Sequence, residues 1–316
     1  MARIARLAAR FEGPAGETDE SIKRAIGDDA AILLPRKRDG EELVWTVDAQ
    51  VEGVHFRADL ASWADIGWRS FMAAASDLAA MGATPWCALS ALVLPKSLAD
   101  DALDALTAGQ AEAARAVGAA IVGGNLARGS EVSITTTLLG TSARAIPRKA
   151  ARGDGIWVSG ALGLAAAGLA ALERKLDPSD PDVARAALAW RRPEARIADG
   201  LRMAAAGSRG AIDVSDGLAQ DIGHIAHASD LRAVLEESAL RAYVLPNVGA
   251  IASRLAVSAM DLALHGGEDY ALIAACDHPI EGFVRLGRFE DGEGVALEGD
   301  GGPPRAIDAR GFDHFR

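Results

Sequence analysis

Acidic residues recur at the borders of apolar segments in this chain of 316 residues, where we expect strands and helices to run into turns. Unpaired carboxylates are very costly to bury, so these residues cannot all belong to the core. If they gather in one place, they repel one another unless cations lie between them. Mg²⁺ prefers such oxygen ligands and is often shared with substrate phosphates. The acidic segments are Gly27-Asp28-Asp29-Ala30-Ala31, Thr46-Val47-Asp48, Ser76-Asp77-Leu78, Asp213-Val214-Ser215-Asp216-Gly217 and Gly267-Glu268-Asp269.

The segment that begins at Asp213 has the clearest pattern. A predicted strand over residues 211–214 delivers Asp213 to a turn, and Ser215 or Asp216 can cap the helix that starts there. The electropositive start of a helix also favours an anion. A single turn of this kind is explained equally well as a plain helix cap. Because acids also end the other apolar segments, where independent caps would more often be Ser, Thr or Asn, the set favours a metal site.

The remaining polar positions each have an ordinary structural alternative. The Thr46 hydroxyl and the Asp48 carboxylate could share one metal ion at the end of a strand. Asp77 interrupts a strongly apolar helix, although an exposed helix acid would look the same. Asp29 could be a simple turn residue. Gly123-Gly124-Asn125 predicts one more polar turn, because glycines let the backbone approach a ligand closely.

Alternating strands and helices are expected to position these residues. The periodicity of the apolar residues predicts helices over 62–81, 98–117, from 163 to about 176, and from 193 or 194 towards 206. Strands are predicted over 42–47, 87–94, 119–122, 132–139, 156–159, 211–214 and 270–275, with loops over 176–182 and 290–304. The pattern indicates an α+β protein of two α/β domains with helices laid on one face of each sheet. A basic, irregular stretch over 142–154 is the expected junction between domains 1–145 and 146–316.

Composition restricts the partners of the chain. The formal net charge of −11 argues against a nucleic-acid binder, and it makes a bridging metal necessary for any phosphate ligand. Cys87 and Cys276 lie in apolar stretches, so we interpret them as core residues of a cytoplasmic protein. No run approaches the roughly 18–20 apolar residues of a membrane span, and residues 1–10 make a poor signal peptide.

Several familiar catalytic and metal motifs are missing from the sequence. It contains no Gly-x-x-x-x-Gly-Lys-Ser/Thr phosphate loop, no Gly-x-Ser-x-Gly nucleophile turn and no His-Glu-x-x-His. His224 and His227 lie three residues apart, but no cysteine or third histidine follows at a zinc-like interval, so we expect no structural zinc site. His55 alone is more simply a loop residue than a ligand.

The acidic segments, taken in order, resemble those of the thiamine-monophosphate kinase family. This family belongs to a larger group of ATP-using enzymes that includes aminoimidazole ribonucleotide synthetase and selenophosphate synthetase. Selenophosphate synthetases carry a reactive cysteine or selenocysteine near the N-terminus, whereas the first cysteine here is Cys87. The resemblance covers nearly the whole chain and extends to Val51-Glu52-Gly53-Val54-His55-Phe56, Ala79-Ala80-Met81-Gly82-Ala83, Arg128-Gly129, Gly266-Gly267-Glu268-Asp269-Tyr270 and Gly311-Phe312-Asp313-His314-Phe315.

The resemblance implies ATP-dependent phosphorylation of thiamine monophosphate to thiamine diphosphate. It also implies a homodimer whose N-terminal sheets pair into a barrel, and a C-terminal sheet covered by helices. ATP would be the co-substrate, and several Mg²⁺ ions would be bound. By similarity, the metal ligands would be Asp29, Thr46, Val47 through its carbonyl, Asp48, Asp77, Asn125, Asp213 and Asp216. ATP would contact Gly124, Asn125, Arg148 and Ser215, and thiamine monophosphate would contact His55, Glu268 and Phe312.

One position departs from the family pattern, and one expected ATP contact has two candidate residues. Asn125 stands where many members have aspartate, which keeps an oxygen ligand and loses one charge. Arg148 is the expected ATP contact, with Arg144 as the alternative.

The expected reaction is direct in-line transfer assisted by Mg²⁺. A phosphate nucleophile is already ionised near neutral pH, so no catalytic histidine, dedicated base or phosphoenzyme is expected. Two other functions stay open at this point. One is an ATP-dependent cyclising ligase of purine synthesis, and the other is a metal-nucleotide binding protein without turnover.

Overall fold

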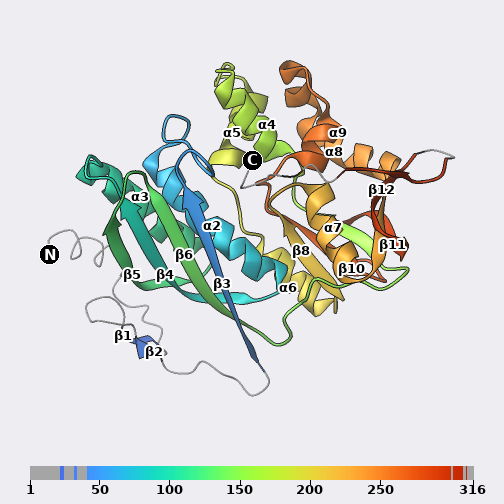
Figure 1. Ribbon diagram of the computed structural model, residues 1–316, viewed down its shortest axis with the longest axis horizontal. Coiled ribbons are helices and arrows are strands. Elements are labelled where there is room, and N and C mark those ends of the chain that lie inside the picture. Colours follow the sequence, from blue (N-terminus) through green and yellow to red (C-terminus); the bar gives the residue numbers. More distant parts are fainter. Residues whose placement is uncertain (1–21, 25–31, 34–40, 300–301, 309–310, 312–316) are drawn as a thin grey trace. The chain divides into compact units, whose positions relative to one another are not determined.

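The computed structural model describes residues 22–24, 32–33, 41–299, 302–308 and 311 (Figure 1). The chain divides into two compact units. One comprises Met1–Leu78 and Ala83–Arg144, and the other comprises Ala79–Gly82 and Ala145–Arg316. Two of the expected site residues, Asp29 and Phe312, lie outside the described residues.

The first unit is built on a four-stranded sheet in the order β3-β6-β4-β5. β6 pairs antiparallel with both of its neighbours, and β4 pairs parallel with β5. Burial alternates residue by residue along β6, which is the pattern of a sheet covered on one face. The helices of this unit are α2 (Trp63–Ala80) and α3 (Asp100–Ala116), and its strands are β1 (Ile22–Arg24), β2 (Ile32–Leu33), β3 (Glu42–Val51), β4 (Thr84–Leu94), β5 (Ala120–Arg128) and β6 (Ser133–Ser142).

Two glycines let α2 and α3 cross at backbone contact. A Cβ atom on Gly67 would lie 1.8 Å from the carbonyl oxygen of Leu106, and one on Gly109 would lie 1.9 Å from that of Ala64. Each helix therefore needs a residue without a side chain where it meets the other. The sequence periodicity predicts both helices but gives no sign of this crossing.

The second unit is built on a seven-stranded mixed sheet in the order β13-β12-β9-β11-β7-β10-β8. Its strands are β7 (Gly155–Ser159), β8 (Gly210–Val214), β9 (Leu231–Glu236), β10 (Ala271–Cys276), β11 (Val284–Asp291), β12 (Gly294–Glu298) and β13 (Arg305–Ala306). The helices are α4 (Leu164–Glu173), α5 (Pro181–Arg191), α6 (Ile197–Ala205), α7 (Leu218–Ala228), α8 (Glu237–Leu255) and α9 (Ala259–His265).

Strand β10 is buried on both faces. Ile273 packs in a core with residues of α4, α7 and α8, whereas Leu272 and Ala274 pack in a second core with Met203 of α6. The expectation of helices on only one face is therefore wrong for this part of the sheet. The physical reason is that every residue of β10 is apolar or small, so neither face can be left in water.

Three other expectations about elements are also corrected. Asp48 and Asn125 do not end strands, because β3 and β5 continue past them. Residues 290–304 are not all loop, because β12 pairs parallel with β9 inside them. In addition, the sequence analysis did not predict the helices α5, α8 and α9. Edge strands tolerate polar residues and glycine in their interiors, which hides their true ends from a pattern based on apolar runs.

Among the described residues no single helix is both long and apolar enough to cross a membrane. α8 and α9 meet these criteria only as a pair bent by 110°.

The helix crossing in the first unit leads to a stability prediction. Gly109→Ala forces a methyl group into the backbone of α2, so we expect it to destabilise the protein by about 2 kcal/mol or more. Gly249→Ala is the matched control: this glycine also lies in a helix, but its added Cβ would meet nothing closer than 3.6 Å. The control should be neutral or stabilising by up to about 1 kcal/mol. Urea unfolding of both variants checks this, and equal effects would contradict the crossing.

Candidate functional site

In the first unit, β3 and α2 bring together three of the expected metal ligands. The Thr46 hydroxyl donates a very short hydrogen bond to Oδ2 of Asp77 across 31 residues of sequence. Strand alternation places Asp48 on the same face of β3 as Thr46. Val47 points the other way and is exposed, so only its carbonyl could serve as a ligand on that face.

Buried polar groups continue from Asp48 across the sheet. Asp48 pairs in register with Thr136, and Thr136 pairs with Ser90. Gln50 Nε2 lies 3.5 Å from Oδ2 of Asp48. Among the described residues, Oε1 of Gln50 and Oγ1 of Thr136 are buried without a hydrogen-bond partner. Buried oxygens of this kind normally have partners, so these atoms fit a site completed by a cation or its water.

Asn125 stands on the opposite edge of this sheet. It lies on β5, three strand spacings from β3, which separates its backbone from that of Asp48 by about 14 Å. It is exposed and pairs in register with Ala91. Its neighbour Gly124 has a φ of 158°, and a Cβ there would lie 1.8 Å from the Ser90 carbonyl oxygen. At this distance Asn125 and Asp48 could bind two separate ions but could not share one.

His55 follows β3 in a short loop. Its Nδ1 accepts a hydrogen bond of 3.1 Å from the backbone N–H of Val51, so the neutral ring carries its hydrogen on Nε2. In the same segment, Oε2 of Glu52 accepts a hydrogen bond of 3.2 Å from the backbone N–H of Val132. This loop therefore has a fixed attachment to the sheet.

In the second unit, a single carboxylate organises the turn between β8 and α7. Asp221 is buried and accepts hydrogen bonds of 3.0 Å from the backbone N–H groups of Ser215, Asp216 and Gly217. Burial, followed by the nearby charge of Asp213, raises the pKa of Asp221 to about 8. Neighbouring buried carboxyl groups of this kind could share a bound cation. Sequence reasoning missed Asp221, although its place one helical turn after Gly217 is a usable signal.

The loop that carries Glu268 is attached to the same turn. The N–H of Glu268 donates to the Ser215 carbonyl at 2.7 Å, and the N–H of Tyr270 donates to the Val214 carbonyl at 2.9 Å. Glu268 and Tyr270 have φ values of 64° and 49°, a left-handed conformation that costs free energy outside glycine. Trp190 Nε1 donates to Oε2 of Glu268 at 2.7 Å. The Glu268 carboxylate is thus held from two sides, by its own backbone and by a tryptophan that sequence reasoning missed.

Asp269 has a structural role. Its carboxylate accepts hydrogen bonds from the backbone N–H groups of Gly163 and Ala165, at the start of α4. Burial is the main cause that raises its pKa to about 7, against the opposing effect of these hydrogen bonds. This acid therefore fixes the end of the Glu268 loop to a helix.

Arg148 and the C-terminal segment both approach α7. Burial, and next the charge of Arg148, lower the pKa of His224, while the charge of Asp216 acts in the opposite direction. Both charged residues therefore lie within electrostatic range of His224. A Cβ on Gly311 would lie 2.9 Å from the Asp216 carbonyl oxygen, so the described part of the C-terminal segment passes beside the turn. Arg144, the alternative to Arg148, belongs to the other unit.

The buried Asp269 leads to a prediction about pH. Its pKa is about 7 in the folded chain against an ordinary 3.8, so folding favours its protonated form. The stability that it contributes is complete below about pH 4 and is lost as the pH rises through about 7. In Asp269→Asn this loss is absent, so the free energy of unfolding should fall less steeply over that range, by at most about 1.4 kcal/mol per pH unit. Urea unfolding of both proteins at several pH values measures the difference, and parallel curves would refute it.

Residues 27–142 match the family described as AIR synthase related protein, N-terminal domain. The thiamine-monophosphate kinase of Aquifex aeolicus (strain VF5) is 30% identical over 92% of this chain and 93% of its own. The crystal structure of thiamine-monophosphate kinase from Stenotrophomonas maltophilia K279a aligns with a TM-score of 0.78 and 34% identity, covering 96% of this chain and 97% of that one.

A further solved structure, AaThiL complexed with AMPPCP and TMP, aligns with a TM-score of 0.81 and 28% identity over 88% of this chain and 89% of that one. HypE, a hydrogenase maturation protein solved in complex with ATP, is only 20% identical at a TM-score of 0.72, so it shares the fold alone. The identity to the kinases extends over most of both chains. The chain belongs to the thiamine-monophosphate kinase family.

Proposed function

We propose that the protein transfers the γ-phosphoryl group of ATP to thiamine monophosphate, giving thiamine diphosphate and ADP. The main support is the similarity over 88% of the chain to AaThiL, which was solved with AMPPCP and TMP bound. Two groups of oxygen donors in this chain are consistent with that role. One surrounds Asp48 and Asp77, and the other surrounds Asp213 and Asp216.

Mg²⁺ fits both groups of donors. The buried oxygens of Gln50 and Thr136, which have no hydrogen-bond partner among the described residues, and the carboxylate of Asp213, which lies near Asp221, are hard ligands for a cation. When bound, Mg²⁺ would offset the charge that develops on the transferred phosphoryl group. The proposed ligands are Asp29, Thr46, the Val47 carbonyl, Asp48, Asp77, Asn125, Asp213 and Asp216.

The residues of the chain bind and orient the two anionic substrates. Gly124 lets the backbone of β5 approach the nucleotide, and Asn125, Ser215 and Arg148 are the other proposed contacts of ATP. His55, Glu268 and Phe312 bind thiamine monophosphate. The carboxylate of Glu268, held by Trp190, is complementary to the positive charge of the thiazolium ring.

The substrate phosphate oxygen attacks the γ-phosphorus directly, and ADP leaves. Because that oxygen is already ionised, the reaction needs no general base, and positioning and charge stabilisation provide the catalysis.

Substituting single metal ligands tests this function. Asp48→Asn and Asp213→Asn each remove one charge without removing volume, so we expect kcat to fall by about 100-fold or more while the thermal midpoint changes little. Asp101→Asn, at an exposed acid in the first turn of α3, is the control and should keep full activity. The readouts are ADP release, thiamine diphosphate formation and thermal unfolding.

Three outcomes would count against the proposal. ADP release that does not require thiamine monophosphate, or cyclising-ligase activity, would favour the purine-synthesis alternative. No ADP release at all would favour a non-catalytic binding protein. Unfolding of both Asn variants would make Asp48 and Asp213 structural residues.

The same proposal includes a homodimer in which the sheets of the first units pair into a barrel. Leu43, Trp45 and Val47 alternate along β3 and are 59%, 73% and 62% exposed on one face of the sheet. Leu89 of β4 is also exposed at 43%. A contiguous apolar face of this kind is typical of a surface that another protein covers. A second copy of the sheet would offer the same apolar face in return.

A charge on this face should separate the two subunits. Trp45→Glu places carboxylates opposite each other in a paired sheet, so we expect the sedimentation coefficient to shift from that of a dimer to that of a monomer at micromolar concentration. Leu188→Glu is the control, since Leu188 is 57% exposed on α5 in the second unit. A dimer that survives Trp45→Glu, or a monomeric parent protein, would exclude pairing through this face.

A further inference from the structure

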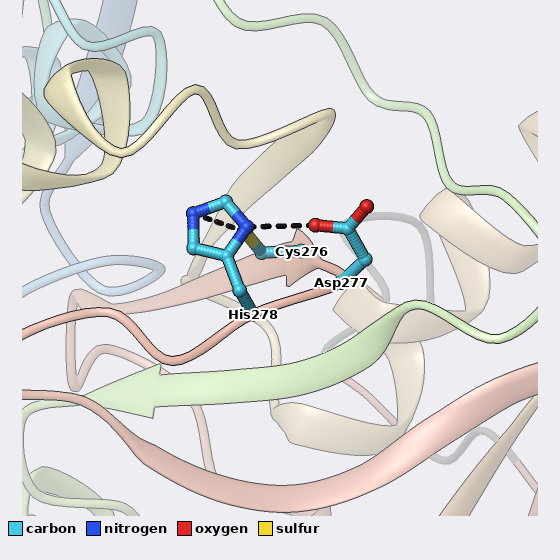
Figure 2. A group of neighbouring side chains, drawn as sticks. All are labelled: Cys276, Asp277 and His278. Carbon is cyan, nitrogen blue, oxygen red and sulfur yellow. Dashed lines mark hydrogen bonds and ion pairs between the residues drawn. The ribbon is translucent and has the colours of Figure 1, made fainter.

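A second cluster of potential metal ligands lies at the far end of β10 from the Glu268 loop. Cys276 is the last residue of the strand, and Asp277 and His278 follow it directly. Figure 2 shows the three side chains turned toward one another. One donor atom from each lies within 4.8 Å of the others. Cys276 is buried, whereas the Asp277 and His278 side chains are 67% and 52% exposed.

The contacts of the His278 ring determine which of its two nitrogens is available to bind a metal ion. Nε2 lies 3.0 Å from the carbonyl oxygen of Ala206, which can only accept, so Nε2 carries a hydrogen. Nδ1 lies 2.7 Å from Oδ1 of Asp277 and 3.5 Å from Sγ of Cys276. If Nδ1 carried only a lone pair, it would be repelled by the carboxylate. At 2.7 Å the space between Nδ1 and Asp277 fits a proton, and a metal ion in its place would need the two atoms to move to about 3.3 Å apart.

The arrangement has the features of a metal-binding histidine. Such histidines usually donate the second ring N–H to a backbone carbonyl or a carboxylate, as Nε2 does here to Ala206. Tetrahedral zinc bonds of normal length separate a nitrogen and a sulfur ligand by about 3.6 Å, close to the observed 3.5 Å between Nδ1 and Sγ. Sγ is also 3.7 Å from Nε2 and so lies beside the ring rather than on the axis of the Nδ1 lone pair.

We propose that Cys276, Asp277 and His278 bind one thiophilic divalent cation of the zinc class, with water as the fourth ligand. Thiolate and imidazole select such ions over Mg²⁺. The exposed imidazole and carboxylate adjust their positions around the buried sulfur, which brings Nδ1 and Sγ to the same ion. The ligands are consecutive in sequence, which explains why the spacing rules for structural zinc sites do not reveal them.

The site is independent of the proposed kinase site within the second unit. β10 begins next to Tyr270 and runs for six residues, so its two ends are about 17 Å apart. The bound ion would join the end of β10 to the end of α6, because Ala206 directly follows that helix. We therefore expect it to stabilise the second unit without entering the phosphoryl transfer.

Binding is balanced by the release of protons. The Cys276 thiol loses its S–H proton, and the imidazolium loses the proton on Nδ1, while Nε2 keeps its hydrogen and its bond to Ala206. Two protons pass to solvent for each divalent cation bound, and no oxidant or reductant takes part.

Titration of the full-length protein with Co²⁺ tests the site, in the presence of excess Mg²⁺ to occupy oxygen sites. We expect the near-ultraviolet charge-transfer absorption of a cobalt–thiolate bond, saturating at one ion per chain and abolished by Zn²⁺. Cys276→Ser should remove this absorption. His278→Gln and Asp277→Asn, at exposed positions, should weaken Co²⁺ binding by about tenfold or more. Cys87→Ser, which removes the other cysteine, should leave it unchanged.

A second measurement does not depend on how well Cys276→Ser folds. Zn²⁺ should raise the thermal midpoint of the parent protein and of Asn125→Ala, and should raise that of His278→Gln less at the same concentration. The proposal is overturned if the parent protein develops no charge-transfer absorption, or if that absorption persists undiminished in His278→Gln. Loss of kinase activity in Asp213→Asn with normal cobalt binding would separate this site from the proposed function.

Discussion

Burial of two neighbouring carboxyl groups is the constraint on which the second unit depends. Asp213 and Asp221 lie close enough for each charge to oppose the other, and both are buried. Three backbone N–H groups hold Asp221 in place, and this defines the path of the turn from Ser215 to Gly217. The charged form of Asp221 is therefore costly, and a cation bound as proposed above would lower that cost.

The acidic segments look alike in sequence, but their carboxylates have two different roles. Asp221 and Asp269 are satisfied by backbone N–H groups at helix starts, which is a structural use. Asp48 and Asp77, in the first unit, accept hydrogen bonds from neutral side chains, the amide N–H of Gln50 and the hydroxyl of Thr46. The donors around a carboxylate therefore distinguish a helix cap from a candidate metal ligand.

Much of the fold was predictable because its helices α2, α3, α4 and α7 carry regular apolar periodicity. The ends of β3 and β5 were not, because polar residues on edge strands interrupt the apolar pattern without interrupting the strand. β12 was missed because its pairing with β9 joins residues that are far apart in sequence. Family resemblance supplied the candidate ligands, whereas Trp190 could not be inferred, since it meets Glu268 from 78 positions away.

The two ends of β10 carry different chemistry, and this follows from their surroundings. Near the start of the strand, the carboxyl groups of Asp213 and Asp221 lie at the turn that precedes α7, and their oxygens are hard ligands. At its end, a buried sulfur lies beside an imidazole whose second nitrogen is already committed to a carbonyl. Because ligand softness governs which cation each group prefers, the strand can hold Mg²⁺-type and zinc-type ligands without competition between them. The strand's fully buried apolar middle keeps these two polar ends apart.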